Sequence, residues 1–154
     1  MDKEHESLVI RSGTREDVPA IYALICELAA YELAPNEVNT TVQTMIEDGF
    51  GNDPVYFSYV AVLDSEVVAA AVFHFKYSTW KGRSLYLDDI IVTEAHRNRG
   101  IGKKLFEEVL KFAKERQCKR VYWQVLNWNT PAIAFYKKYM VSMDDSWINC
   151  AIDM

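Results

Sequence analysis

Residues Leu85–Leu105 have the sequence LYLDDIIVTEAHRNRGIGKKL, and the predicted fold rests mainly on this stretch. Its first part, Leu85–Val92, is rich in Leu, Ile and Val, which is typical of a buried strand. A basic turn with two glycines follows, and from Gly100 to Arg116 apolar residues recur on one helical face. A strand, a turn and a helix in this order predict a crossover to a parallel strand, which we place at Val121–Leu126.

Elements on both sides of this stretch complete a sheet with helices. Thr14–Asp17 has the spacing of a capping box, and a helix is predicted to carry the apolar stripe that follows, from Val18 to Ala29. Asp64 and Ser65 form a predicted turn between two strands. The other predicted helices are Thr40–Asp48, stopped by Gly49 and Gly51, and Pro131–Tyr139, and the other predicted strands are Leu8–Arg11, Val55–Leu63, Val67–Tyr77 and Trp147–Ile152. This order predicts an α/β (α+β) fold with a central sheet.

Length and composition favour one globular domain over residues 1–154. Half of the residues are hydrophobic and a quarter are charged, which is an ordinary balance for a folded chain. The net charge of −5 argues against nucleic acid as a partner, because nucleic-acid binding needs a basic surface. The same acidic charge permits cationic substrates.

The cysteines and histidines predict no metal site. Three cysteines without a Cys-x-x-Cys pair indicate neither a disulfide framework nor a zinc site, and the histidines lack ligand spacing. Met1–Ser7 is polar, without the apolar core of a signal peptide. No stretch approaches the roughly 18 apolar residues of a membrane span. We therefore expect no membrane partner, and cytoplasm is the predicted location.

The basic turn has the features of a phosphate site. N–H groups at the start of a helix point outward, and the helix dipole favours negative charge there. Gly100 and Gly102 keep side chains away from a closely approaching phosphate, and Arg97, Arg99 and Lys103 add positive charge. The pattern is neither a Walker loop nor the dinucleotide motif G-x-G-x-x-G.

Arg97–Gly102 resembles the pyrophosphate-binding motif of the GNAT acetyltransferase family, and Asn127–Asn129 with the helix after it resembles the family's second CoA-binding region. Over nearly the whole chain the sequence is similar to the diamine acetyltransferases of that family, which include the spermidine/spermine and thialysine enzymes. The stretches that carry this likeness are Ile10–Arg11, Glu27–Ala29, Tyr31–Glu32, Glu47–Gly51, Tyr77–Arg83 and Tyr86–Asp89. The sequence YSTWKGR at Tyr77–Arg83 is closer to the thialysine branch. The resemblance implies the GNAT fold, with a mixed, mostly antiparallel sheet splayed at the acetyl-CoA site and flanked by helices.

The resemblance also implies that acetyl-CoA is the cosubstrate. The residues implied in its binding belong to one strand, the glycine turn and one later asparagine: Ile90, Ile91, Val92, Arg97, Asn98, Arg99, Gly100, Ile101, Gly102, Lys103 and Asn129. Tyr136 matches the family's general acid. A phenol with an ordinary pKa near about 10 suits the protonation of a thiolate leaving group.

The acceptor is expected to be an amine that loses a proton before it attacks. Asp88 matches the family glutamate that binds the amine and relays its proton, and Tyr31 and Glu32 match positions at the acceptor end. In a regular strand the neighbours Asp88 and Asp89 point to opposite faces, so one of them is expected to face the pocket. We expect Asp88 to be that residue, with Asp89 in a structural role, in a subunit contact or at the far edge of the acceptor site. His74 is interpreted as structural.

These residues together predict transfer of an acetyl group from acetyl-CoA to a primary amine of a small diamine, polyamine or lysine-like acceptor, by direct attack. Two alternatives stay open: a protein lysine or N-terminal acetyltransferase, and a non-catalytic CoA-binding regulatory module. The diamine branch implies a homodimer. Met140 stands where the family usually has glycine, and a positive φ there would strain a methionine.

Overall fold

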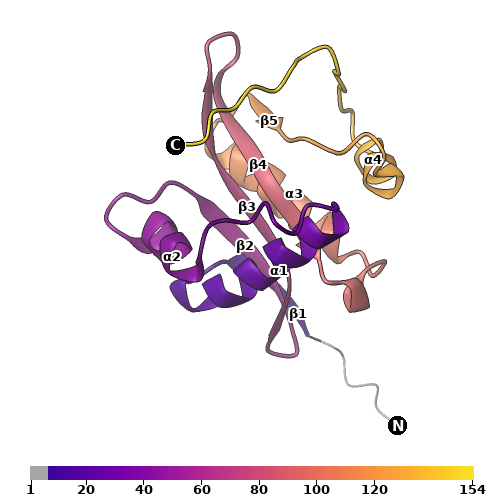
Figure 1. Cartoon of the computed structure of the whole chain (residues 1–154). Helices are drawn as coiled ribbons and strands as arrows, with labels where there is room; N and C mark the ends of the chain where they lie inside the picture. The colour runs from indigo at the N-terminus through magenta and orange to yellow at the C-terminus, as the bar shows by residue number, and fades with distance from the viewer. Residues whose placement is uncertain (1–6) are drawn as a thin grey trace. The chain divides into compact units, whose positions relative to one another are not determined.

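The computed structural model describes residues 7–154, which form two compact parts (Figure 1). The first part ends at Trp123, and the second runs from Gln124 to Met154. Residues 1–6 of the polar segment Met1–Ser7 lie outside the described residues, and the single domain expected over residues 1–154 stays a prediction. Within residues 7–154, no helix is both long enough and apolar enough to cross a membrane.

The first part is built on a five-stranded sheet in the order β1-β2-β3-β4-β5 (Figure 1). The strands are, in chain order, Leu8–Ser12, Phe57–Leu63, Glu66–Ser78, Gly82–Val92 and Arg120–Tyr122. Neighbours pair antiparallel from β1 to β4, whereas β4 and β5 are parallel. A parallel pair needs a crossover, and α3 (Ile101–Glu115) supplies it. The predicted mixed sheet and its parallel pair are confirmed.

The turn between β2 and β3 has the backbone that a tight hairpin requires. Leu63 pairs with Glu66, so only Asp64 and Ser65 lie in the turn. Both residues have a positive φ, 48° and 70°, as in a type I′ turn. The turn predicted at these two residues is confirmed.

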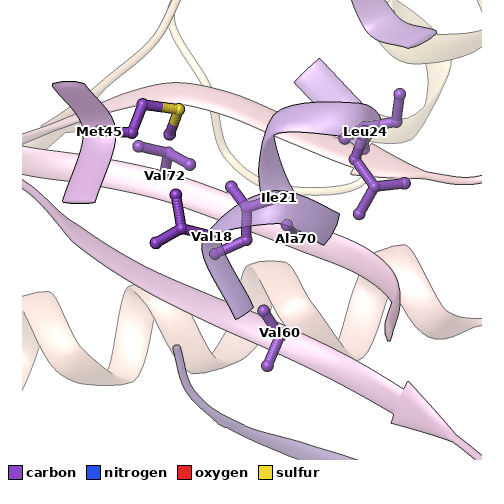
Figure 2. Close-up of a cluster of buried hydrophobic side chains, with 8 residues drawn as sticks. Val18, Ile21, Leu24, Met45, Val60, Ala70 and Val72 are labelled. Atoms are coloured by element: carbon purple, nitrogen blue, oxygen red, sulfur yellow. The ribbon is translucent and has the colours of Figure 1, made fainter. Parts of the chain in front are cut away.

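Two helices, α1 (Val18–Tyr31) and α2 (Val42–Phe50), cover one face of the sheet. Figure 2 shows their apolar side chains meeting those of the strands beneath. The buried members of this cluster are Val18, Ile21, Leu24, Met45, Val60, Ala70, Val72 and Ile91. Both helices are confirmed, and the apolar stripe predicted for α1 is the surface that it buries.

Helix α2 differs from its prediction at the C-terminus. The sequence predicts a stop at Gly49, yet the helix continues to Phe50 and Gly51 forms its C-cap. Gly49 serves packing instead, because a Cβ at this position would collide with the ring of Tyr56.

Helix α3 covers the opposite face of the sheet, where aromatic rings gather. The rings around Phe112 of this helix, with centroids 5.1–6.3 Å away, belong to Phe57, Tyr59, Phe73 and Phe75. Leu105 and Val109 of the same helix are fully buried. This packing holds α3 against the sheet and thereby fixes the position of the basic turn at its N-terminus.

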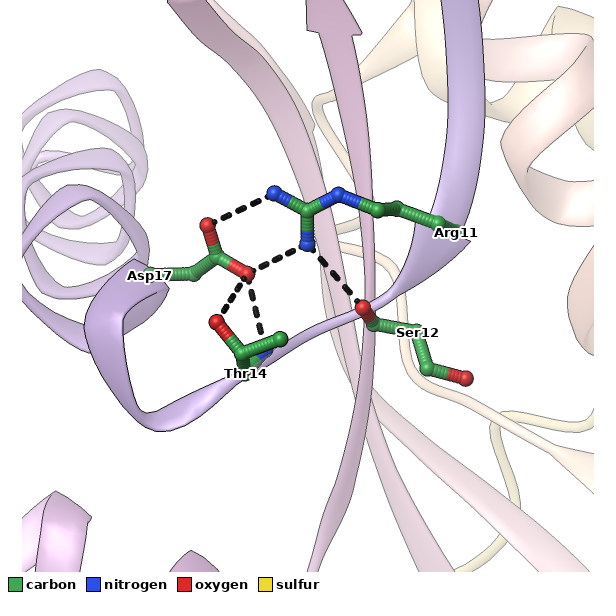
Figure 3. Close-up of polar contacts among 4 residues, drawn as sticks. All are labelled: Arg11, Ser12, Thr14 and Asp17. Atoms are coloured by element: carbon green, nitrogen blue, oxygen red, sulfur yellow. Dashed lines mark hydrogen bonds and ion pairs between the residues drawn. The ribbon is translucent and has the colours of Figure 1, made fainter.

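An ion pair ties β1 to the start of α1 (Figure 3). Two guanidinium nitrogens of Arg11 donate to the carboxylate of Asp17, at 2.6 and 3.0 Å. The backbone N–H and the hydroxyl of Thr14 donate to the same carboxylate. Mainly because of the Arg11 bonds, the pKa of Asp17 falls from 3.8 to about 2. The predicted capping box is confirmed, and Arg11 reinforces it.

The second part contains the short helix α4 (Thr130–Tyr136). The side-chain oxygen of Asn129 caps this helix by accepting the N–H of Ala132 at 3.3 Å. Pro131 lies in the first turn, where its missing N–H is not needed. The predicted helix is confirmed, although it ends earlier than expected. Met140 lies beyond it and does not have the positive φ that would favour glycine.

The strand predicted at Trp147–Ile152 is wrong, since this segment has no regular secondary structure. Trp147 and Ile148 are 72% and 87% exposed, so the apolar residues bury no face of a sheet here. A strand needs partners for its backbone groups, and no strand of the described chain pairs with this segment. The strand predicted at Val121–Leu126 is also shorter than expected and ends at Tyr122.

Replacing Asp17 with Asn tests the ion pair of Figure 3. Because the folded-state pKa of Asp17 is lowered, its charge stabilises the folded chain above about pH 4, and this contribution is lost as the pH falls towards 2. We expect Asp17→Asn to lower the free energy of unfolding by about 2 kcal/mol at pH 7. Urea denaturation should show the difference from wild type shrinking between pH 4 and pH 2. An equal loss at every pH would contradict this cause.

Candidate functional site

Strand β4 carries one residue more than β3 at a β-bulge. Val72 pairs with Asp89 and Phe73 pairs with Leu87, so Asp88 is the extra residue in the register. A bulge bends its strand and redirects the nearby side chains. It lies here at the two acidic residues on which the predicted acceptor site depends.

The bulge places Asp88 and Asp89 on the same face of the sheet. Asp89 precedes Ile91 by two positions and shares its face, and Ile91 packs in the cluster beneath α1. Asp88 bonds to His74, which follows Val72 by two positions, and Val72 belongs to that same cluster. The expectation that the two aspartates point to opposite faces does not hold here, because alternation requires a regular strand.

Glu32, at the C-cap of α1, completes an acid cluster of Glu32, Asp88 and Asp89. Burial, together with the charges of Asp88 and Glu32, raises the pKa of Asp89 from 3.8 to about 6. Burial also raises the pKa of Glu32. The acid cluster concentrates negative charge and therefore favours a cationic ligand. No group of three or more His, Cys, Asp or Glu side chains in residues 7–154 is arranged to hold a metal ion.

His74 is a candidate functional residue that the sequence reasoning missed. Its Nδ1 lies 2.6 Å from Oδ2 of Asp88, and the ring centroids of His74 and Tyr86 are 5.5 Å apart. His74 and Tyr86 are partners across the β3–β4 hairpin, so a correct strand register would have located His74 near Asp88. The sequence does not reveal the bulge that brings the carboxylate of Asp88 within reach of His74.

The basic turn before α3 has a backbone that suits an anion. Gly100 is the N-cap and has a φ of 77°, and Asn98 also has a positive φ, 61°. The N–H groups of the first helical turn have no carbonyl partner within the helix. A Cβ at Gly102 would meet only Cγ2 of Val92, at an ordinary 3.6 Å. The glycine thus keeps open a space beside these N–H groups that the protein does not fill.

Arg97 ties the basic turn to its surroundings. Its Nε donates to the carbonyl of Val92 at 2.9 Å, and its NH2 group lies 3.4 Å from Oε1 of Glu27 in α1. The guanidinium also lies over the ring of Tyr31, 5.2 Å from its centroid. The predicted acceptor residue Tyr31 and the predicted cofactor residue Arg97 therefore contact each other. Arg97 orients the basic turn and also adds positive charge to it.

Three further predicted cofactor residues follow Arg97. Arg99 is exposed and approaches His96 at 3.4 Å. Lys103 is exposed, with its Nζ 3.8 Å from Oε1 of Glu107. The side chain of Ile101 is buried, so only its backbone can meet a ligand. This end of α3 thus combines outward N–H groups with exposed cations.

The free edge of β4 presents the backbone groups of alternate residues. β5 pairs with only the first part of β4, and no other described strand continues the sheet on that side. Thr93 donates its N–H to the carbonyl of Val68 at 2.9 Å. This bond shows that the backbone groups of Thr93 point toward β3. By alternation, Ile91 turns its N–H and C=O toward β3, whereas Ile90 and Val92 turn theirs toward the free edge. A ligand at this edge would pair with Ile90 and Val92 rather than with Ile91.

Asn129 and Tyr136 lie in the second part of the chain. Asn129 is the N-cap of α4. Tyr136 is the last residue of that helix, and its side chain is buried, with its ring centroid 5.4 Å from that of Phe135. The cofactor contact implied for Asn129 and the general-acid role implied for Tyr136 stay predictions.

Comparisons with known proteins give consistent results. The model of the acetyltransferase (GNAT) family matches residues 21–140. Thialysine N-epsilon-acetyltransferase from Bos taurus is 37% identical over 138 residues, which cover 84% of this chain and 81% of that protein. Spermidine/spermine N(1)-acetyltransferase-like protein 1 from Homo sapiens is 32% identical over 82% of this chain and 19% of its own length. The solved structure of aminoglycoside N-acetyltransferase AAC(6')-Iy in complex with CoA has a TM-score of 0.78 over all of both chains at 15% identity, which shows the shared fold.

Replacing Asp89 with Asn tests the electrostatics of the acid cluster. Because the pKa of Asp89 is raised, the folded chain holds this proton more tightly than the unfolded chain, so stability falls as the pH rises from about 4 to 6. We expect Asp89→Asn to raise the free energy of unfolding at pH 7 by about 2–3 kcal/mol and to change it little at pH 4. Urea denaturation at both pH values measures the free energy of unfolding. Asp17→Asn is the control, because it should lower this free energy at pH 7. A destabilised Asp89→Asn variant at pH 7 would contradict the raised pKa.

Proposed function

This chain belongs to the GNAT family of acetyltransferases and is an acetyl-CoA-dependent N-acetyltransferase, and on this premise we propose that its acceptor is a primary amine of a small diamine, polyamine or lysine-like molecule. We also propose that it acts as a homodimer, as the resemblance to diamine acetyltransferases implies. The acid cluster carries the proposal for the acceptor. The similarity to thialysine N-epsilon-acetyltransferase supports it, since that relative is named for an acceptor of this kind.

An acceptor with more than one cationic group matches the acid cluster best. The carboxylates of Glu32, Asp88 and Asp89 raise one another's energy when all are ionised, and the raised pKa of Asp89 reflects this repulsion together with burial. A bound ammonium group favours the charged form of each neighbour and offsets the repulsion. One ammonium group cannot neutralise three carboxylates, so a second cationic group adds further stabilisation.

The acceptor must lose a proton before its nitrogen can attack. An alkylammonium group has an ordinary pKa near about 10.4 and has no lone pair at neutral pH. Asp88 accepts one proton from it, directly or through a water molecule, at the position of the family's glutamate. Asp89 and Glu32 hold the cationic acceptor beside it. The bulge, which turns the carboxylate of Asp88 to the same face as that of Asp89, supports this assignment.

Tyr136 is the proposed general acid. As the acceptor nitrogen bonds to the acetyl carbon and the carbon–sulfur bond breaks, Tyr136 gives its phenolic proton to the sulfur. Tyr136 regains a proton from the new amide nitrogen. The ammonium group loses two protons in all, of which one ends on sulfur and the other leaves to solvent from Asp88, so protons and charge balance.

The residues present fit acetyl-CoA, which supplies the acetyl group. The N–H groups at the start of α3, with Arg99 and Lys103 beside them, suit its pyrophosphate, and Gly102 leaves the space that a phosphate needs. The outward backbone groups of Ile90 and Val92 suit the amides of its pantetheine arm. The carbonyl of Val92 already accepts from Arg97, so Ile90 and the N–H of Val92 are the proposed contacts.

The test of this function is release of the CoA thiol from acetyl-CoA with putrescine, spermidine, spermine, lysine, thialysine and a lysine-containing peptide. We expect release with at least one small diamine, and Tyr136→Phe should lower its kcat by about 100-fold while CoA affinity changes little. Release with the peptide alone would contradict the small acceptor. No release with any acceptor, despite tight binding of acetyl-CoA, would contradict the proposal. Unchanged kcat in Tyr136→Phe would remove Tyr136 as the general acid.

A methyl group at Gly102 tests the placement of the pyrophosphate. Because a Cβ there meets only Val92 at 3.6 Å, Gly102→Ala should fold normally and gain up to about 1 kcal/mol of helix propensity. The same methyl group would occupy the space beside the N–H groups, so we expect CoA affinity to fall at least about tenfold, or 1.4 kcal/mol. Calorimetric titration with CoA measures affinity, and thermal unfolding controls for the fold. Unchanged CoA affinity would place the pyrophosphate elsewhere.

A further inference from the structure

We propose that His74 is a positioning residue for acetyl transfer, which orients the carboxylate of Asp88 toward the acceptor amine. This inference rests on the proposed function, and it adds a residue to which the sequence assigned only a structural role. It depends on three features of the structure: the bond between the two side chains, their exposure, and the bulge that carries Asp88.

The bond between His74 and Asp88 is short and joins neighbouring strands. Nδ1 of His74 in β3 lies 2.6 Å from Oδ2 of Asp88 in β4. An ionised carboxylate only accepts hydrogen bonds, so this contact requires a proton on Nδ1. Oδ2 is then engaged with His74, and Oδ1 is the oxygen left to meet the amine.

Exposure shows that this pair contributes little to stability. The side chains of His74 and Asp88 are 37% and 40% exposed. Ion pairs and hydrogen bonds at such exposure stabilise a fold only slightly, because water screens them and competes for them. The effect of removing His74 should therefore appear in activity rather than in folding.

The bulge explains why Asp88 needs a partner. As the extra residue of β4, Asp88 has no residue opposite it in the β3–β4 register to restrict its side chain. Its neighbour Asp89 is acidic and repels it rather than holds it. His74 is the nearby donor that fixes one of its oxygens, and the ring of Tyr86, 5.5 Å away between centroids, supports the imidazole.

A double-mutant cycle between His74 and Asp88 tests the inference. His74→Phe keeps an aromatic ring beside Tyr86 but removes the donor, and Asp88→Ala removes the carboxylate. In thiol-release assays with the preferred amine, we expect His74→Phe to lower kcat/KM for the amine about tenfold and to leave the KM for acetyl-CoA unchanged. In the Asp88→Ala background, His74→Phe should cause no further loss, because His74 acts only through Asp88.

Rescue by asparagine separates positioning from packing. The amide nitrogen of Asn is bonded to Cγ, as Nδ1 of His is, so His74→Asn can donate to Asp88 without the imidazole ring. We expect His74→Asn to recover most of the activity that His74→Phe loses. Tyr77→Phe, at an exposed neighbouring position of β3, is the matched control and should behave as wild type.

Three outcomes would overturn the inference. Additive losses in the cycle would show that His74 acts independently of Asp88, and full activity of His74→Phe would show that it does not act at all. If His74→Phe lowers the thermal unfolding temperature in step with activity, its role is structural. Failure of the proposed function has a different signature, since wild type would then release no thiol with any amine, whereas an active wild type with an additive cycle rejects only the role of His74.

Discussion

The one extra residue in β4 is the constraint on which the proposed acceptor site depends. Leu87 pairs with Phe73 on the face that α3 covers. With strict alternation, Asp89 would lie on that same face among aromatic rings, where an unpaired carboxylate is costly. The bulge instead turns Asp88 and Asp89 together toward α1, and the raised pKa of Asp89 is the energetic consequence. The same extra residue resets the alternation beyond it, so that Val92 lies beside Gly102 of α3.

Much of the fold could be predicted from the sequence because its signals are local. The apolar stripes of α1 and α3, the turn at Asp64–Ser65 and the capping box at Asp17 each depend on residues close together in the chain. The glycine turn is equally local, since the φ of 77° at Gly100 favours glycine and Gly102 lies two residues further along the chain. The acetyltransferase family was predicted from the resemblance of Arg97–Gly102 and Asn127–Asn129 to the motifs of that family.

The features that were missed depend on pairing between distant segments. Nothing in the residues around Asp88 specifies that β4 carries one residue more than β3, so the shared face of the two aspartates and the contact between His74 and Asp88 could not be predicted. The segment Trp147–Ile152 has strand-forming residues, but pairing decides whether a strand forms, and this segment has no regular structure. Arg97 was predicted as a charge for phosphate, yet its bonds to Val92 and Glu27 require β4 and α1 to be in place.

Two acidic residues lie near the middle of β4 and three basic residues lie around the start of α3, although Arg83 in the strand and Glu94 after it have the opposite signs. Asp88 and Asp89 lie in the strand itself, and Arg97, Arg99 and Lys103 follow in the turn and the first residues of α3. CoA carries phosphates and the proposed acceptor carries ammonium groups, so each region attracts one reactant and repels the other. In the proposed arrangement, electrostatics therefore helps to keep the two reactants in separate regions until their reacting groups meet.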